Sequence, residues 1–75
     1  MKLSEIKAGG TVKIVEIKSS PAVAAKLQNL GVAQGSFITV LRFAPFGTPV
    51  EIKADNTRIA IGKAETDKIT VEYVV

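Results

Sequence analysis

The side chains that most often perform catalysis or bind transition metals are absent from this sequence. It contains neither cysteine nor histidine, which removes thiolate nucleophiles, the commonest general base and the commonest transition-metal ligand. No serine lies in a G-x-S-x-G turn, and Gly62-Lys63 lacks the spacing of a phosphate-binding loop. We therefore predict that the protein is not an enzyme and has no bound cofactor.

Carboxylates are the remaining candidates for acid–base chemistry or for binding hard cations. Most of the seven acids occupy expected turns or the outer faces of expected strands, among them Glu51, Asp55, Glu65, Asp67 and Glu72. Carboxylates in such places are usually solvated surface charges, and no D-x-D-x-D run of the calcium-loop type is present. We expect neither a catalytic carboxylate pair nor a metal site.

The most distinctive stretch is an apolar loop with the sequence FAPFGTPVEI, residues 43–52, which holds two of the three phenylalanines. We expect Phe43 to turn inward and close one end of the core. Phe46 stands between a proline and a glycine at a turn tip, where neighbours cover a ring poorly. An exposed ring on a proline-stiffened loop loses little entropy on binding, which suits a protein-interaction anchor. The predicted partner-binding residues of this loop are Phe43, Pro45, Phe46, Gly47 and Pro49.

Five segments have the composition or alternation of β-strands: residues 11–18, 35–43, 49–54, 57–61 and 68–75. The apolar positions of the first segment change phase after Ile14, which predicts a bulge or burial on both faces. The third and fourth segments form a hairpin around Asp55-Asn56, expected to be a type I′ turn with Ile52 opposite Ile59 and Val50 opposite Ile61. The last segment alternates strictly at Ile69, Val71, Tyr73 and Val75.

One helix is predicted at about residues 20–30. Ser20 is placed to cap it before a proline in the first turn, and Gly31 is placed to end it. Leu27 and Leu30 continue an apolar stripe that must pack on the strands, because so short a helix is unstable alone. We expect core packing for most of their surface, and partner contact for the remainder. The polar run KAETD after the fourth strand can make one further helical turn.

These elements predict a mainly β protein, with residues 1–75 forming a single small domain. Short strands and tight turns favour a strongly bent sheet or partly open barrel of five strands with one inserted helix. The amino terminus lacks a secretory h-region, and no apolar run approaches the ~18 residues of a membrane helix. We expect a cytoplasmic protein that reaches a membrane only indirectly.

The net charge of +3 comes from ten basic residues scattered among seven acids. Nucleic-acid-binding barrels usually interleave exposed aromatics with basic residues, and Arg42-Phe43 is the single such adjacency here. We therefore expect no nucleic acid partner, although a small nucleic-acid-binding barrel remains an alternative function.

Four stretches in order, LSEIKAGGTVKIVEI, KLQNLGVAQG, APFGTPVEI and RIAIGKAETDKITV, resemble FeoA, the small cytoplasmic accessory protein of bacterial and archaeal ferrous-iron transport. The similarity covers nearly the whole chain. It implies an SH3-like barrel with a helical insertion. It also implies a partner, the membrane transporter FeoB with its cytosolic GTP-binding domain. The function it implies is that of a non-enzymatic interaction module that binds or modulates this domain.

The chain departs from the family pattern at three places. Thr48 stands where an acid is common, Asp55-Asn56 replaces a turn with glycine, and Gln34 replaces a proline. The change at Thr48 removes a charge that a partner contact could use. A related barrel forms the carboxy-terminal domain of iron-dependent repressors. A regulatory domain of that type, acting through self-association or by docking on its own chain, is therefore the second alternative. The absence of a helix-turn-helix favours the free-standing accessory protein.

Overall fold

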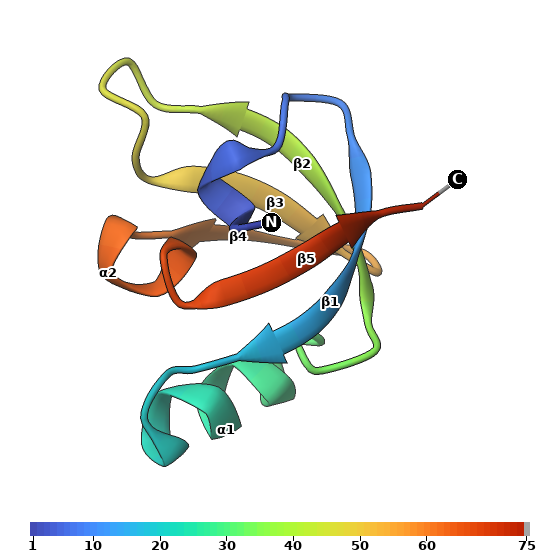
Figure 1. The fold of residues 1–75 in the computed structure, drawn as a ribbon, viewed down its shortest axis with the longest axis vertical. Coiled ribbons are helices and arrows are strands. Elements are labelled where there is room, and N and C mark those ends of the chain that lie inside the picture. The colour runs from blue at the N-terminus through green and yellow to red at the C-terminus, as the bar shows by residue number, and fades with distance from the viewer. Residues whose placement is uncertain (75) are drawn as a thin grey trace.

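A single five-stranded antiparallel sheet forms the body of the protein in the computed structural model, which describes residues 1–74 (Figure 1). The expected strands and the expected helix all form, with ends that differ by a few residues from the predicted ranges. In chain order the elements are η1 (Leu3–Glu5), β1 (Thr11–Ile17), α1 (Pro21–Asn29), β2 (Phe37–Phe43), β3 (Val50–Ala54), β4 (Thr57–Ile61), α2 (Lys63–Thr66) and β5 (Ile69–Tyr73).

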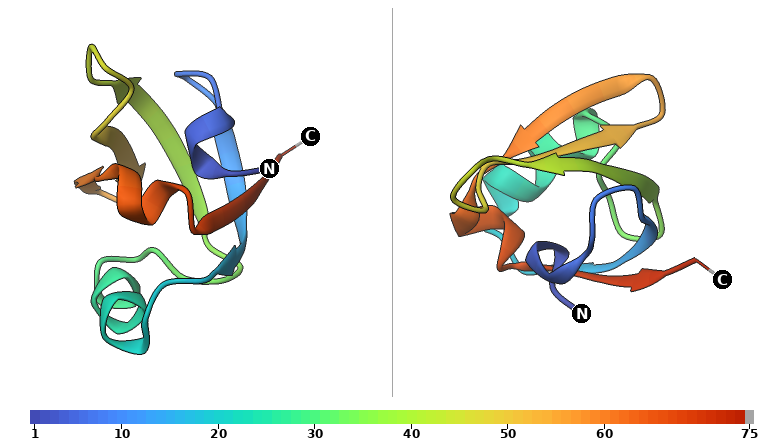
Figure 2. Two further views of the ribbon diagram at one scale, coloured as in Figure 1. Left: turned by 60° about the vertical axis from the view of Figure 1, so that its left-hand side comes forward. Right: turned by 90° about the horizontal axis from the view of Figure 1, so that it is seen from above.

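The strands follow the order β4-β3-β2-β1-β5, so β4 and β5 are the two edges of the sheet. The sheet bends strongly and brings α2 and β5 back beneath β3 and β4 (Figure 2). This is the small, partly open barrel that the short strands and tight turns predicted. The buried apolar side chains gather inside it, and the largest fully buried ones are Leu3, Ile6, Ile14, Ile38, Ile52 and Ile69.

Two irregularities interrupt the sheet. The register between β1 and β5 shifts between Ile14 and Glu16, which confirms the bulge predicted from the change of phase. Val15 lies in this bulge and is exposed. A second shift separates Val40 from Arg42 in the pairing of β2 with β3. Nothing in the alternation of β2 predicted it, because both faces of that strand are largely apolar.

The β3–β4 hairpin has the predicted register, with Ile52 opposite Ile59 and Val50 opposite Ile61. The predicted type I′ turn is wrong. That turn needs a positive φ at both central residues, whereas Asp55 has a φ of 53° and is the one non-glycine residue with a positive φ in residues 1–74. A single left-handed residue is enough here to reverse the chain and keep Ala54 opposite Thr57.

Helix α1 begins and ends at the predicted signals. The Oγ of Ser20 accepts a hydrogen bond from the Val23 N–H at 3.4 Å, which satisfies one of the free donors of the first turn. Gly31 follows the helix with a φ of 91°, the left-handed conformation that glycine adopts without steric cost. The helix lies at one end of the molecule's long axis (Figure 1).

The alternation predicted for the last strand is only partly realised. Ile69 and Val71 are buried, whereas Tyr73 is exposed, and Val75 lies outside the described residues. Tyr73 leaves the core because β5 is an edge strand whose end runs past the barrel. Its hydroxyl oxygen lies 3.4 Å from the Lys7 N–H, which donates to it.

The first residues of the chain cover the outer edge of β5. The amino group of Met1 donates to the Val71 carbonyl at 3.0 Å, and the Val71 N–H donates to the Met1 carbonyl at 2.6 Å. Lys2 continues the contact as a bridge to Thr70. In the described part of the chain, no strand or bridge lies along the outer edge of β4. Within the described residues, the outer edge of β5 is therefore covered by the amino-terminal segment, whereas the outer edge of β4 is not covered.

Candidate protein-interaction surfaces

The loop between β2 and β3 is held in a defined shape. The Ala44 N–H donates to the Pro49 carbonyl at 3.1 Å, and the Gly47 N–H donates to the Ala44 carbonyl at 2.8 Å. Gly47 has a φ of 93°, which a side chain would disfavour. The backbone itself thus turns Phe46 away from the protein, and 98% of the Phe46 surface is exposed.

Phe43 behaves differently from Phe46, as predicted. It is partly buried and packs against the core cluster, so it fixes the base of the loop. Its ring lines two shallow depressions, of about 240 Å³ on the side of Pro45 and Pro49 and about 250 Å³ on the side of Phe46 and Thr48. Pro45, Gly47 and Pro49 are exposed. We call residues 43–49 the loop surface.

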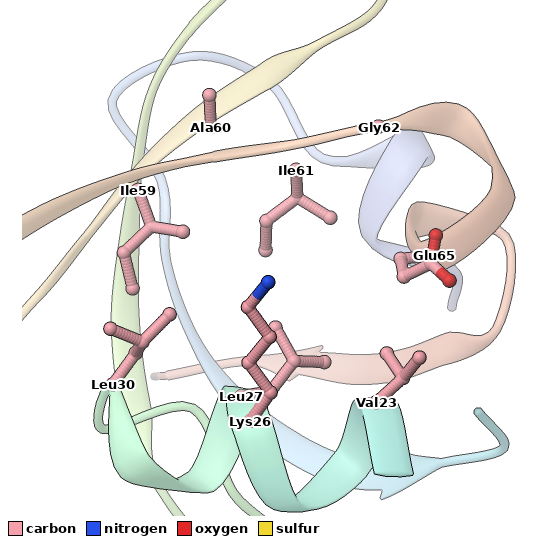
Figure 3. Close-up of a pocket in the computed structure, with 9 residues that line it drawn as sticks. All are labelled: Val23, Lys26, Leu27, Leu30, Ile59, Ala60, Ile61, Gly62 and Glu65. Atoms are coloured by element: carbon pink, nitrogen blue, oxygen red, sulfur yellow. The ribbon is translucent and has the colours of Figure 1, made fainter. Parts of the chain in front are cut away.

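The other two predicted contact residues lie elsewhere. Leu27 is buried, whereas Leu30 keeps 38% of its surface exposed. Both line a groove of about 310 Å³ between α1 and β4, which we call the α1–β4 groove (Figure 3). Its lining residues are Val23, Lys26, Leu27, Leu30, Ile59, Ala60, Ile61, Gly62 and Glu65.

Apolar side chains from both elements face each other across this groove. Val23, Leu27 and Leu30 point up from the helix toward Ile59 and Ile61 of β4 (Figure 3). Ile61 is buried, and Ile59 is partly buried against the core. The groove is thus the outer margin of the hydrophobic core, left open where the helix stops short of the strand.

Two charged side chains accompany the apolar lining. Lys26 is exposed, and in the view of Figure 3 its side chain projects over the groove, whereas the carboxylate of Glu65 lies at the end next to Val23. The salt bridges between described residues join Lys18 with Glu16, Arg42 with Glu51 and Arg58 with Glu51, so neither Lys26 nor Glu65 has an ionic partner among them.

The structure does not bring all the predicted contact residues together. The loop surface and α1 lie at opposite ends of the long axis (Figures 1 and 2). Strand β4 runs between them, and Ala60 lines both the α1–β4 groove and the depression beside Pro45 and Pro49. Two candidate surfaces therefore meet along one edge strand.

Nothing in the sequence indicated that Lys26, Ile59, Ile61 or Glu65 would line a contact surface. Alternation correctly placed both isoleucines on the inner face of the hairpin, but it gave no sign that β4 lies at an edge. Glu51 lies between Arg42 and Arg58 on the outer face, with its carboxylate 3.0 Å from the Arg42 Nε and 3.6 Å from an Arg58 guanidinium nitrogen. Exposed pairs of this kind contribute little to stability.

Within residues 1–74, no group of three or more acidic side chains is arranged to hold a metal ion. The same residues contain no helix long and apolar enough to cross a membrane.

Comparison with known proteins identifies the family. The model of the FeoA domain matches residues 1–73. The chain belongs to the FeoA family. This family takes part in ferrous-iron transport and consists of small accessory domains of SH3-like fold. The resemblance seen in the sequence is thereby confirmed.

Several FeoA proteins of known structure are similar to this chain. The FeoA protein of Chlorobium tepidum is 37% identical with a TM-score of 0.93, over 100% of this chain and 71% of that one. FeoA of Stenotrophomonas maltophilia, described as a prokaryotic SH3 domain protein and solved with zinc, is 25% identical with a TM-score of 0.76, over 96% of this chain and 89% of that one.

A curated relative links the FeoA domain to a transporter. The Fe(2+) transport protein A/Fe(2+) transporter FeoB fusion protein of Porphyromonas gingivalis is 27% identical over 74 residues, which are 99% of this chain and 9% of that protein. ScaR, solved with bound zinc, shares the fold, with a TM-score of 0.85 at 20% identity over 99% of this chain and 37% of that one. That likeness concerns the fold alone.

Proposed function

We propose that this FeoA domain is a non-enzymatic interaction module of ferrous-iron uptake that binds the cytosolic GTP-binding region of a FeoB-type transporter. It acts at the cytoplasmic face of the membrane and is recruited there by the transporter. The fusion of the two proteins in one Porphyromonas gingivalis chain supports this partner, because fused domains are held at high effective concentration.

A single observation carries the binding role, namely the almost complete exposure of Phe46 on a loop of fixed shape. Phe43 packs against the core at the start of the loop. The Ala44 N–H donates to the Pro49 carbonyl across the base of the loop, and the Gly47 N–H donates to the Ala44 carbonyl. A large ring presented in this way buries much apolar area on binding and loses little conformational entropy. The loop surface is therefore the proposed anchor.

The test is a binding measurement between this protein and the isolated cytosolic region of the transporter, with GDP and with a GTP analogue. Replacing Phe46 with serine removes the proposed anchor, so we expect Kd to rise roughly 10-fold to 100-fold, as for central aromatic residues in other interfaces. The matched control is Phe37→Ser, because Phe37 is also exposed but lies at the opposite end of β2.

Each outcome decides a separate point. Binding that is lost in Phe46→Ser and kept in Phe37→Ser supports the loop surface. Equal affinity of the parent chain and Phe46→Ser excludes the loop as anchor. Absence of binding by the parent chain in both nucleotide states rejects the proposed partner.

A further inference from the structure

The backbone of β4 offers unpaired hydrogen-bonding groups on its outer side. In a hairpin with a two-residue turn, the residues next to the turn exchange both backbone hydrogen bonds, and every second residue along the strand does the same. Thr57 pairs with Ala54, and Ile59 pairs with Ile52. The N–H and C=O groups of the alternate residues, Arg58 and Ala60, therefore point away from β3.

Proteins commonly cover or blunt the edges of their sheets. This chain covers β5 with Met1 and Lys2, but the described residues provide no such cover for β4. The edge carries a single charged side chain, that of Arg58, which already contacts Glu51. The difference between the two edges suggests that β4 is left open for a ligand.

The α1–β4 groove lies beside this open edge. A strand added next to β4 would direct alternate side chains inward, to the same side of the sheet as Ile59 and Ile61. On that side it would meet the apolar face of α1, formed by Val23, Leu27 and Leu30 (Figure 3). The groove thus has the position that the inward side chains of a sixth strand require.

The charges of the groove define the chemistry of its ligand. Lys26 lines the groove as an exposed side chain and has no acidic partner among the described residues. A carboxylate on an inward-facing side chain of the ligand would supply that partner, and the charge complementarity would favour such a ligand over a cationic one. Alternating apolar residues around one acidic residue are therefore the complementary pattern.

We propose that β4 binds an extended segment of the partner protein as a sixth strand, with apolar side chains in the α1–β4 groove and a carboxylate on Lys26. Strand addition of this type gains affinity from backbone hydrogen bonds and specificity from the pockets beside them. The proposal rests on the proposed function for the identity of the partner. Its ligand chemistry comes from the groove alone.

The first test uses synthetic peptides and needs no transporter. A blocked peptide Thr-Val-Thr-Glu-Thr-Val-Thr, which places two valines and one glutamate on the same face of a strand, is titrated into the ¹⁵N-labelled protein. We expect amide shifts in α1 and β4, and exchange of the Arg58 and Ala60 amide protons slowed at least about 10-fold at saturation. Shifts that lie elsewhere, or unchanged exchange at these two amides, would overturn the proposal.

Charge reversal tests the role of Lys26. The same peptide with lysine in place of glutamate should bind several-fold more weakly to the parent protein. In Lys26→Glu this preference should reverse, since the two charges are exchanged across the groove. An unchanged preference in the variant would contradict the assignment of the carboxylate to Lys26.

Backbone blocking separates strand addition from simple apolar binding. Ala60→Pro removes an outward N–H without touching the pairing to β3, and edge positions tolerate proline. The affinity of Ala60→Pro for the glutamate peptide should fall at least about 10-fold. The control variant Ala60→Val should bind the peptide as tightly as the parent protein. Should Ala60→Pro fail to fold, a peptide N-methylated on the amides facing β4 tests the same bonds. If the N-methylated peptide binds as tightly as the unmethylated one, strand addition is rejected.

Two further measurements distinguish the alternatives. If protection of the Arg58 and Ala60 amides rises with protein concentration without peptide, the edge binds a second copy of this chain, and the proposed ligand is wrong.

Ala60→Pro is also tested against the transporter's GTP-binding region. Loss of binding there supports the proposal, and unchanged binding rejects it for this partner. No binding by the parent chain rejects the proposed function and leaves the peptide result as the test of the groove.

Discussion

Phe43 and Phe46 lie three residues apart and have opposite environments. Phe43 ends β2 and packs against the core, whereas Phe46 occupies the tip of a turn and touches almost nothing. The sequence allowed this division to be predicted, because a ring between proline and glycine at a turn tip has few neighbours. The exposure of Phe37, at the start of the same strand, could not be predicted, since both faces of β2 are apolar.

The two rings should therefore have different effects on stability. Replacing Phe43 with alanine removes a partly buried ring, and we expect a loss of about 1–3 kcal/mol in the free energy of unfolding. Replacing Phe46 with alanine should change it by less than about 0.5 kcal/mol, because an exposed ring gains no burial on folding. Urea unfolding of both variants checks this. A large loss in Phe46→Ala would show that the ring packs on the protein.

At the scale of elements, local signals located each strand and the helix to within a few residues. Ser20 and Gly31 marked the helix, and alternation marked the β3–β4 hairpin. The turn type was wrong because Asp55 alone takes a positive φ. The α1–β4 groove was missed for another reason, since strand order depends on pairings between distant segments that alternation does not encode. Ile59 and Ile61 were correctly placed inside, but not at an edge.

The end of α1 provides a prediction at this scale. Alanine at Gly31 would have room, because its Cβ would lie 3.6 Å from the nearest atoms of Ala54 and Asp55, but the φ of 91° would remain. The strain should therefore be conformational, and we expect a loss of about 1–2 kcal/mol in the free energy of unfolding. Asparagine tolerates the left-handed region better, so Gly31→Asn should lose less. Thermal unfolding of both variants checks the order. Equal losses would indicate a steric clash instead.

At the scale of the whole molecule, residues 1–74 form a barrel whose edge at β5 is covered and whose edge at β4 carries no strand or bridge. The covering segment is anchored by Leu3 and Ile6, which are buried completely or almost so. Apolar residues near a chain end are easily taken for a frayed terminus, and the sequence analysis assigned them no role. Their burial places the first residues along β5 and leaves β4 as the exposed strand, next to both candidate surfaces.

This arrangement predicts that Leu3 stabilises both the core and the covered edge. Leu3→Ala leaves a cavity under η1, and we expect a loss of about 2–5 kcal/mol in the free energy of unfolding. The surface variant Lys2→Ala is the control and should change stability by less than about 0.5 kcal/mol. Because Leu3 anchors the segment that bonds to Val71, hydrogen exchange of the Val71 amide should accelerate in Leu3→Ala more than exchange of the Ile52 amide in the sheet centre. Equal acceleration of both amides would mean that the covering segment opens only when the whole protein unfolds. The covering segment would then be an integral part of the barrel.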